Sequence, residues 1–232
     1  MKPTYDFSAE TIYWPTGEPF KHTKEFEGVS NKGFYYSAYK YSASEHGGTH
    51  IDAPIHFAKE GNTLDQIPLE KLVGRGIVID VSQKLNKDYQ ITTSDITSWE
   101  KKNGKIKDDS ILLLYTGHSK YWPNKLEYLG TNKIGIEGVK ELHFPGLHPD
   151  AAKWLVENRK IKAIGLDTPS IDYGQSQSFE CHQILLEKNI PIFENVANLN
   201  KLPPKDVKII ALPMKIKGGS GGPLRIVARV KN

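Results

Sequence analysis

Three histidines and an aspartate lie together in one short segment of this chain. Residues 45–57 read Glu-His-Gly-Gly-Thr-His-Ile-Asp-Ala-Pro-Ile-His-Phe and hold three of the eight histidines, namely His46, His50 and His56, together with Asp52. Imidazole and carboxylate groups are the ligands that zinc and similar divalent cations prefer. The segment therefore predicts a metal site. A catalytic site is favoured over a structural one, because structural zinc sites favour cysteine and the chain has only Cys181.

The spacing favours an extended segment over a helix. His46 and His50 are four residues apart, as in the helical zinc motif His-Glu-x-x-His. However, each of the two glycines between them would cost a helix about 1 kcal/mol relative to alanine, and Pro54 would end or kink it. In a strand, His50 and Asp52 share one face, and the glycines let the chain turn so that His46 reaches the same point.

Composition sets the class of protein. At 232 residues we expect one domain that spans residues 1–232, with an ordinary 38% of hydrophobic and 25% of charged residues. The net charge of +4 is too weak and dispersed to indicate nucleic acid binding. The sequence shows no apolar signal region and no apolar run that could span a membrane. With a single cysteine it fits a reducing compartment, so we expect a cytoplasmic protein that binds a small molecule.

Strands and helices are intermixed along the chain. Short apolar or β-branched runs are typical of strands, and amphipathic segments behind cap residues are typical of helices. The mixture predicts an α/β domain with a large, partly antiparallel sheet. Strands are expected at 33–42, 76–81, 110–115, 162–166, 190–193, 207–212 and 224–230, and helices at 92–102, 149–158 and 179–188. The last strand should bury one alternating face, Leu224, Ile226, Ala228 and Val230.

The second half of the chain holds further polar candidates. Residues 167–172, Asp-Thr-Pro-Ser-Ile-Asp, follow a predicted strand, where α/β proteins often place functional loops. His182 lies on the next predicted helix, and Glu194 lies at the end of the strand after it. Taken singly, such residues are more often structural or solvated than functional.

Other features have structural interpretations beside functional ones. Residues 218–222 are glycine-rich but lack a phosphate-binding pattern, so we expect a turn packed close to the site. Cys181 adjoins His182, but neighbours on a helix point in different directions, which favours a buried, inert thiol. Aromatic residues lie mostly in cores but also line pockets, and the pocket candidates are Trp14, Tyr121, Trp122 and Phe179.

The metal segment resembles the signature His-x-Gly-Thr-His-x-Asp-x-Pro-x-His of the cyclase-like metal-dependent hydrolases. This family includes bacterial kynurenine formamidase (arylformamidase) and isatin hydrolase. The similarity continues through residues 165–172, His182 and Glu194, and it ends in residues 212–225, so that it spans most of the chain. Residues 5–8, Tyr-Asp-Phe-Ser, resemble the family's opening strand less specifically.

The resemblance implies roles that spacing alone does not give. The positions that match metal ligands are His46, His50, Asp52, His182 and Glu194. Asp52 would be shared where two metals are bound, and His56 matches the catalytic histidine. The resemblance also implies a compact α/β fold around a mixed, barrel-like sheet, and homo-oligomers with a dimer favoured. The implied metal is zinc, as one ion or two, in the formamidases and manganese in the isatin hydrolases.

These residues indicate hydrolysis of a C–N bond. A divalent cation lowers the pKa of bound water from about 16 to about 7, which supplies hydroxide for attack on an amide or formamide carbonyl. His56 could then carry a proton to the leaving amine, or it could instead orient a ligand. We predict an arylformamidase that converts N-formylkynurenine and water to kynurenine and formate in tryptophan catabolism. The alternatives are an isatin-type cyclic amide hydrolase, a non-hydrolytic cyclase or dehydratase, and a metal-binding protein without turnover.

Overall fold

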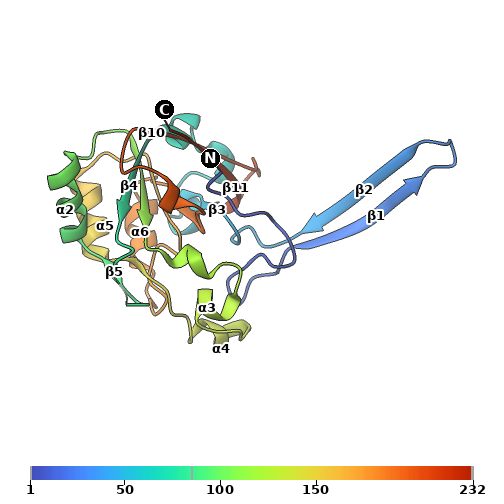
Figure 1. Cartoon of the computed structure of the whole chain (residues 1–232), viewed down its shortest axis with the longest axis horizontal. Coiled ribbons are helices and arrows are strands. Elements are labelled where there is room, and N and C mark those ends of the chain that lie inside the picture. Colours follow the sequence, from blue (N-terminus) through green and yellow to red (C-terminus); the bar gives the residue numbers. More distant parts are fainter. Residues whose placement is uncertain (1, 85, 231–232) are drawn as a thin grey trace.

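Seven strands close into a barrel in the part of the chain that the computed structural model describes, residues 2–84 and 86–230 (Figure 1). These strands are β3 (His50–Asp52), β4 (Val73–Asp80), β6 (Ser110–Tyr115), β8 (Ala163–Leu166), β9 (Ile192–Glu194), β10 (Val207–Pro213) and β11 (Gly221–Val230). Their order around the barrel is β10-β11-β3-β9-β8-β6-β4. The pairs β4–β6, β6–β8 and β8–β9 are parallel, and the other pairs of the barrel are antiparallel. The predicted α/β fold with a mixed, barrel-like sheet is therefore confirmed.

The alternating side chains of the barrel strands divide the core in two. One buried cluster draws on all seven strands and fills the barrel, with Ile51, Leu113 and Phe193 among its members. The opposite faces of β4, β6, β8 and β9 supply a second cluster, which includes Leu112 and Leu114. Because successive strand residues point to opposite faces, this second cluster lies on the outer surface of the barrel.

Three helices cover that outer surface. They are α2 (Thr93–Asn103), α5 (Pro149–Asn158) and α6 (Glu180–Leu186), and their apolar residues join the second cluster. The structure confirms each predicted helix to within two residues at either end. The Thr92 hydroxyl accepts from the Asp95 backbone N–H, and the Asp95 carboxylate accepts from the Thr92 backbone N–H, so that the start of α2 is capped from both sides.

Shorter elements connect these layers. They are the helices α1 (Leu69–Leu72), α3 (Lys125–Leu129) and α4 (Gly135–Val139) and the paired strands β5 (Gln90–Ile91) and β7 (Gly146–Leu147). None of the helices within residues 2–84 and 86–230 is long and apolar enough to cross a membrane.

Two expectations about strands need correction. Val230 is 37% exposed rather than buried, because it lies at the end of β11, beyond the barrel core. The aromatic strand expected at 33–42 exists as β2 (Tyr35–Ser42), but it pairs with a strand that the sequence did not predict, β1 (Lys21–Val29). Charged and polar residues dominate β1, so it lacks the apolar pattern of a core strand. The two strands form a hairpin that projects from the barrel (Figure 1).

Candidate metal centre

The pairing of β3 with β9 puts three of the candidate ligands on one surface. The antiparallel register sets His50 opposite Glu194 and Ile51 opposite Phe193. Since Ile51 and Phe193 point into the barrel, His50, Asp52 and Glu194 point outward, towards α6. All three polar side chains are buried there.

Both carboxylates of this surface face two histidines. The Nε2 atom of His50 lies 3.2 Å from Asp52 Oδ1 and 3.4 Å from Glu194 Oε2. The Nε2 atom of His182, on α6, lies 3.3 Å from the other oxygen of each carboxylate, Asp52 Oδ2 and Glu194 Oε1. Each carboxylate therefore offers one oxygen to each of two neighbouring positions. The sequence suggested such sharing for Asp52 but not for Glu194.

His46 reaches the same carboxylate from the loop before β3. Its Nδ1 atom lies 2.7 Å from Asp52 Oδ1, and its Nε2 atom lies 2.9 Å from Ser220 Oγ. The Ser220 hydroxyl donates to the carboxylate of Glu45 at 2.8 Å. A Cβ atom on Gly221 would lie 2.5 Å from the His46 ring, so this close approach requires glycine. The prediction that the glycine-rich turn packs close to the site is confirmed.

Two histidines are oriented through their other ring nitrogen. His50 Nδ1 donates to the backbone carbonyl of Gly48 at 2.9 Å, and His182 Nδ1 lies 2.6 Å from Asp172 Oδ2. Asp172 also accepts the backbone N–H of His182 at the start of α6. A ligating histidine in metalloproteins commonly donates its second N–H in this way. These bonds leave Nε2 of both rings facing the carboxylates.

The donor set fits a divalent cation. The Oδ2 atom of Asp52 is buried and accepts no hydrogen bond from any residue that the structure describes. The Nε2 atom of His182 lies 3.3 Å from it. A buried carboxylate oxygen without a hydrogen bond is costly, and a cation would satisfy it. Two groups bring their ligand atoms within 4.8 Å of one another, His50–Asp52–Glu194 and His46–Asp52–His56. The five residues predicted as ligands thus converge at one place.

Charge coupling governs protonation in this cluster. Burial alone would raise the pKa of Asp52, but its close contacts with His182, His46 and His50 hold that pKa well below its usual value. Burial and the charge of Asp52 raise the pKa of Glu194. Burial opposes a proton on His50, yet the Asp52 carboxylate raises the pKa of His50 to about 9. The pKa of His182 is also raised, because Asp172, Asp52 and Glu194 outweigh burial.

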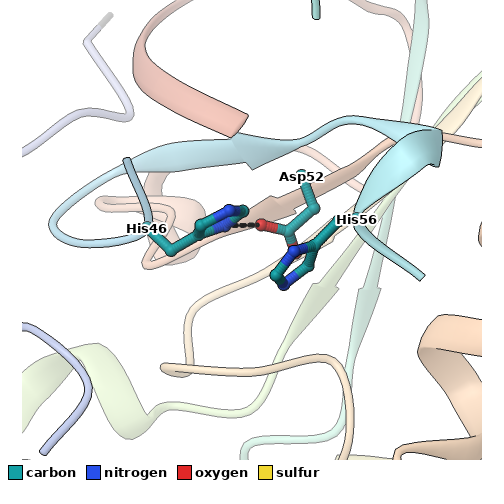
Figure 2. A group of neighbouring side chains, drawn as sticks. All are labelled: His46, Asp52 and His56. Atoms are coloured by element: carbon teal, nitrogen blue, oxygen red, sulfur yellow. Dashed lines mark hydrogen bonds and ion pairs between the residues drawn. The ribbon is translucent and has the colours of Figure 1, made fainter. Parts of the chain in front are cut away.

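His56 differs from these histidines. It ends a short 3-10 turn after β3, and its ring stacks on that of His46 with centroids 3.9 Å apart. Figure 2 shows both rings beside the carboxylate of Asp52. Burial lowers the pKa of His56 to about 4, which leaves the ring neutral at neutral pH. A neutral imidazole can accept a proton or bind a cation, so the geometry allows both roles.

An apolar cavity of about 330 Å³ opens onto these residues. Its aromatic wall is formed by Trp14, Phe57 and Phe179, and the ring of Phe179 lies 5.7 Å from that of Phe57 and 6.2 Å from that of Trp14. Phe57 also stacks on His182 at 4.6 Å. Trp14 and Phe179 therefore lie where a substrate ring would contact them, and their role in binding stays a prediction.

Two of the four aromatic pocket candidates are placed elsewhere. Tyr121 and Trp122 pack against a separate buried cluster around Tyr128 and Leu129. The Trp122 ring stacks on Tyr5 with centroids 4.1 Å apart. The assignment of these two residues to the pocket is wrong, because an aromatic pattern does not distinguish a core from a cavity wall.

The expected inert thiol is confirmed. Cys181 is fully buried, and its sulfur donates to the carbonyl oxygen of Leu147 at 3.0 Å. Burial raises its pKa, which disfavours the thiolate.

Sequence analysis assigned no individual role to four residues of the site, namely Glu45, Phe57, Asp172 and Ser220. Three of them act through contacts between distant segments, such as the bond between Ser220 and Glu45 across 175 positions. The signals for Asp172 and Ser220 were their places in the loop of residues 167–172 and in the glycine-rich turn, together with the resemblance that extends through both segments. Phe57 directly follows His56, where an aromatic residue has no distinctive spacing.

Comparison with known proteins identifies the family. A family model described as "Putative cyclase" matches residues 4–173. The chain belongs to this family. It is 32% identical over 197 residues to the isatin hydrolase of Roseibium aggregatum, covering 80% of this chain and 72% of the relative. It is also 32% identical over 223 residues to the kynurenine formamidase of Bacillus cereus, covering 93% of this chain and 90% of the relative.

Solved structures of this family share the fold. Isatin hydrolase A from Ralstonia solanacearum superposes with a TM-score of 0.90 at 30% identity, covering 100% of this chain and 91% of that chain. The resemblance inferred from residues 46–57 is therefore confirmed along the whole length of the barrel.

We predict that metal affinity rises with pH. The pKa of His50 is raised to about 9 and that of His182 is raised as well, so each must lose a proton before it binds a cation. At a pH below these raised pKa values the two histidines keep their protons, so the affinity for the metal falls as the pH falls. The association constant should rise about tenfold or more per pH unit between about pH 6 and pH 8. Chelator competition with Zn²⁺ or Mn²⁺ measures it, and a flat profile would contradict the protonated histidines.

A second prediction concerns Ser220. Ser220→Ala removes the hydroxyl that links His46 Nε2 to Glu45, so His46 loses its orientation. Metal affinity should fall about 10- to 100-fold, as measured by calorimetric titration of the metal-free protein. Ser98→Ala, at an exposed position of α2, is the matched control and should bind the metal like the unmodified chain. Equal affinities for the two variants would show that Ser220 does not position His46.

Proposed function

We propose that this protein is a divalent-metal-dependent hydrolase of a C–N bond, an arylformamidase that converts N-formylkynurenine and water to kynurenine and formate. The observation that carries the proposal is the shared cavity, which is lined both by Asp52 and Glu194 and by the aromatic residues Trp14, Phe57 and Phe179. Such a cavity would bind a substrate with its aryl group against the aromatic residues and its amide group beside the candidate metal ligands. The Bacillus cereus kynurenine formamidase, which matches 93% of this chain, supports the choice of substrate.

The proposed metal is zinc, with manganese as the alternative. Imidazole and carboxylate donors without a thiolate suit both ions. Asp52 and Glu194 each have two carboxylate oxygens, so together they could bind two metal ions. We propose that the ligands are His46, His50, Asp52, His182 and Glu194. When bound there, the metal would supply Lewis acidity and a water whose pKa is lowered to about 7.

The other residues would bind and move protons. Trp14, Phe57 and Phe179 present ring surfaces that would hold the aryl group and exclude water from the site. His56 is neutral at neutral pH and lies beside Asp52. It would accept a proton from the attacking water and pass it to the leaving amine. Asp172 would hold His182 in place through the 2.6 Å contact to Nδ1.

Isatin is the second candidate substrate. The observation in its favour is structural, since the isatin hydrolase A of Ralstonia solanacearum matches the whole of this chain with a TM-score of 0.90. Isatin is a cyclic amide fused to an aromatic ring, and the same cavity would bind it. A cytoplasmic location also belongs to the proposal, and the single buried Cys181 is compatible with it.

The substrate assay separates these candidates. Purified protein, stripped with a chelator and reloaded with zinc or manganese, is assayed with N-formylkynurenine and, in parallel, with isatin. We expect formate release from N-formylkynurenine that the chelator abolishes and one of the metals restores. Turnover of isatin alone would move the assignment to a ring-opening hydrolase. No turnover of either substrate with either metal would contradict both assignments.

His56→Ala tests the proton transfer. We expect kcat/KM to fall about 10²- to 10⁴-fold, while metal content, measured by elemental analysis, is unchanged. His143→Ala is the control, because His143 is a largely exposed histidine that pairs with Asp88 on the surface. Full activity of His56→Ala would contradict the proton-transfer role. Loss of the metal would instead make His56 a ligand, as its place in the group with His46 and Asp52 allows.

A further inference from the structure

Asn195 directly follows the candidate ligand Glu194 in the chain, lines the same cavity and is buried. Its backbone has a φ of 53°, in the left-handed region that asparagine adopts more readily than most residues. The chain therefore turns at the end of β9, and the side chain of Asn195 reaches the loop that precedes β3. Its amide is neither a candidate ligand nor a part of the proposed proton transfer.

The side chain of Asn195 bonds to two segments that are distant in the sequence. Its Nδ2 group donates to the Gly48 carbonyl at 2.8 Å, and its Oδ1 atom accepts from the hydroxyl of Tyr128, on α3, at 2.8 Å. That hydroxyl also lies 3.0 Å from the carbonyl of Asp167. Because a carbonyl oxygen can only accept, the amide nitrogen must face Gly48 and the amide oxygen must face Tyr128. Tyr128 is fully buried, so the orientation of the amide is held from both sides.

The Gly48 carbonyl connects this amide to a candidate ligand. It accepts the Nδ1–H of His50 at 2.9 Å as well as the amide of Asn195, so both of its lone pairs are used. Because Nδ1 of His50 faces an acceptor, that nitrogen carries the hydrogen, and the lone pair of the neutral ring lies on Nε2. Nε2 is the atom that faces the two carboxylates. The position of the Gly48 carbonyl therefore determines which nitrogen of His50 is available to a cation.

A second bond links the same two segments. The hydroxyl of Thr49 donates to the backbone carbonyl of Asn195 at 2.7 Å, and both residues are buried. The two residues before His50 are thus bonded to the residue after Glu194. Since the strand register sets His50 opposite Glu194, these bonds extend the pairing of β3 and β9 beyond the last pair of the ladder. A shift of the loop relative to β9 would break both bonds.

We propose that Asn195 is a positioning residue of the metal centre and that the hydroxyl of Tyr128 holds Asn195 in turn. The amide of Asn195 fixes the Gly48 carbonyl, and this carbonyl keeps the hydrogen of His50 on Nδ1, so that Nε2 would bind the cation. Both residues act through His50 and not on the metal itself. The inference rests on the metal site of the proposed function, but it does not depend on which amide is the substrate.

A double-mutant cycle in metal affinity tests the proposal. The full chain, stripped of metal, is titrated with Zn²⁺ by calorimetry. Asn195→Ala should weaken binding about 10- to 100-fold, and Tyr128→Phe, which removes only a hydroxyl, should weaken it about three- to tenfold. The double variant should bind no more weakly than Asn195→Ala alone, because Tyr128 acts only through Asn195. Two independent effects would instead multiply.

Tyr89→Phe is the matched control. The hydroxyl of Tyr89 donates to Asp95 at 2.6 Å at the start of α2, away from the cavity. Its loss should lower the free energy of unfolding, measured with a denaturant, but leave the affinity for Zn²⁺ unchanged. Tyr128→Phe should lower both.

Three outcomes would overturn the proposal. They are an unchanged affinity of a folded Asn195→Ala, an affinity of Tyr128→Phe equal to that of Tyr89→Phe, and a double variant in which the two losses multiply. Circular dichroism shows whether each variant is folded, and if Asn195→Ala is not, the comparison of Tyr128→Phe with Tyr89→Phe still decides. An unmodified chain that binds neither Zn²⁺ nor Mn²⁺ would contradict the metal site itself, and this result is distinct from a failure of the variants alone.

Discussion

Two carboxylates, Asp52 and Glu194, are buried together on the outer surface of the barrel, and their negative charge must be compensated where water cannot do so. Four histidines surround them, and the contacts of His50 and His182 hold protons on those rings in the absence of a metal. A divalent cation is the other way to compensate the same charge. A metal that binds here therefore displaces protons from the same atoms. The rest of the site keeps the two carboxylates and the histidines close together.

The barrel provides the rigidity that this crowding needs. β3 contributes only three residues, but it pairs with β9 on one side and β11 on the other, so its outward residues have little freedom. The inward residues Ile51 and Phe193 anchor the same strands in the core. Close approach is then made possible by small residues. A Cβ atom on Gly47 would lie 2.1 Å from the Tyr13 ring, so the loop that delivers His46 can only pack there without one.

The chemistry and the substrate surface come from different parts of the fold. Most of the candidate ligands lie on barrel strands and on α6, whereas two of the aromatic wall residues, Trp14 and Phe57, lie outside the regular elements. Such connections are free to vary without disturbing the ligands. This separation is consistent with one family containing a kynurenine formamidase and an isatin hydrolase. The hairpin of β1 and β2 is a third part, since it forms a separate sheet and adds nothing to the barrel core.

The features that could be predicted from the sequence are those that depend on local spacing. His50 and Asp52 share a strand face because the period of a strand is two, and Thr92 and Pro149 mark the starts of α2 and α5 through capping chemistry. The short apolar strands of the barrel were likewise evident from composition. His182 and Glu194 became candidates only through the family resemblance, because an isolated histidine or glutamate has no diagnostic neighbours.

Features that depend on contacts between distant segments could not be predicted from local patterns. Glu194 faces both His50 and His182 because β9 pairs with β3 in one register, and no local pattern encodes that register. Ser220 reaches His46 across 174 positions for the same reason. Tyr121 and Trp122 have the composition of pocket residues yet pack in a core, and the aromatic strand β2 has the composition of a core strand yet stands in solvent. Hydrophobicity indicates that burial of a side chain is favourable, but the fold determines whether the side chain is buried and by which residues.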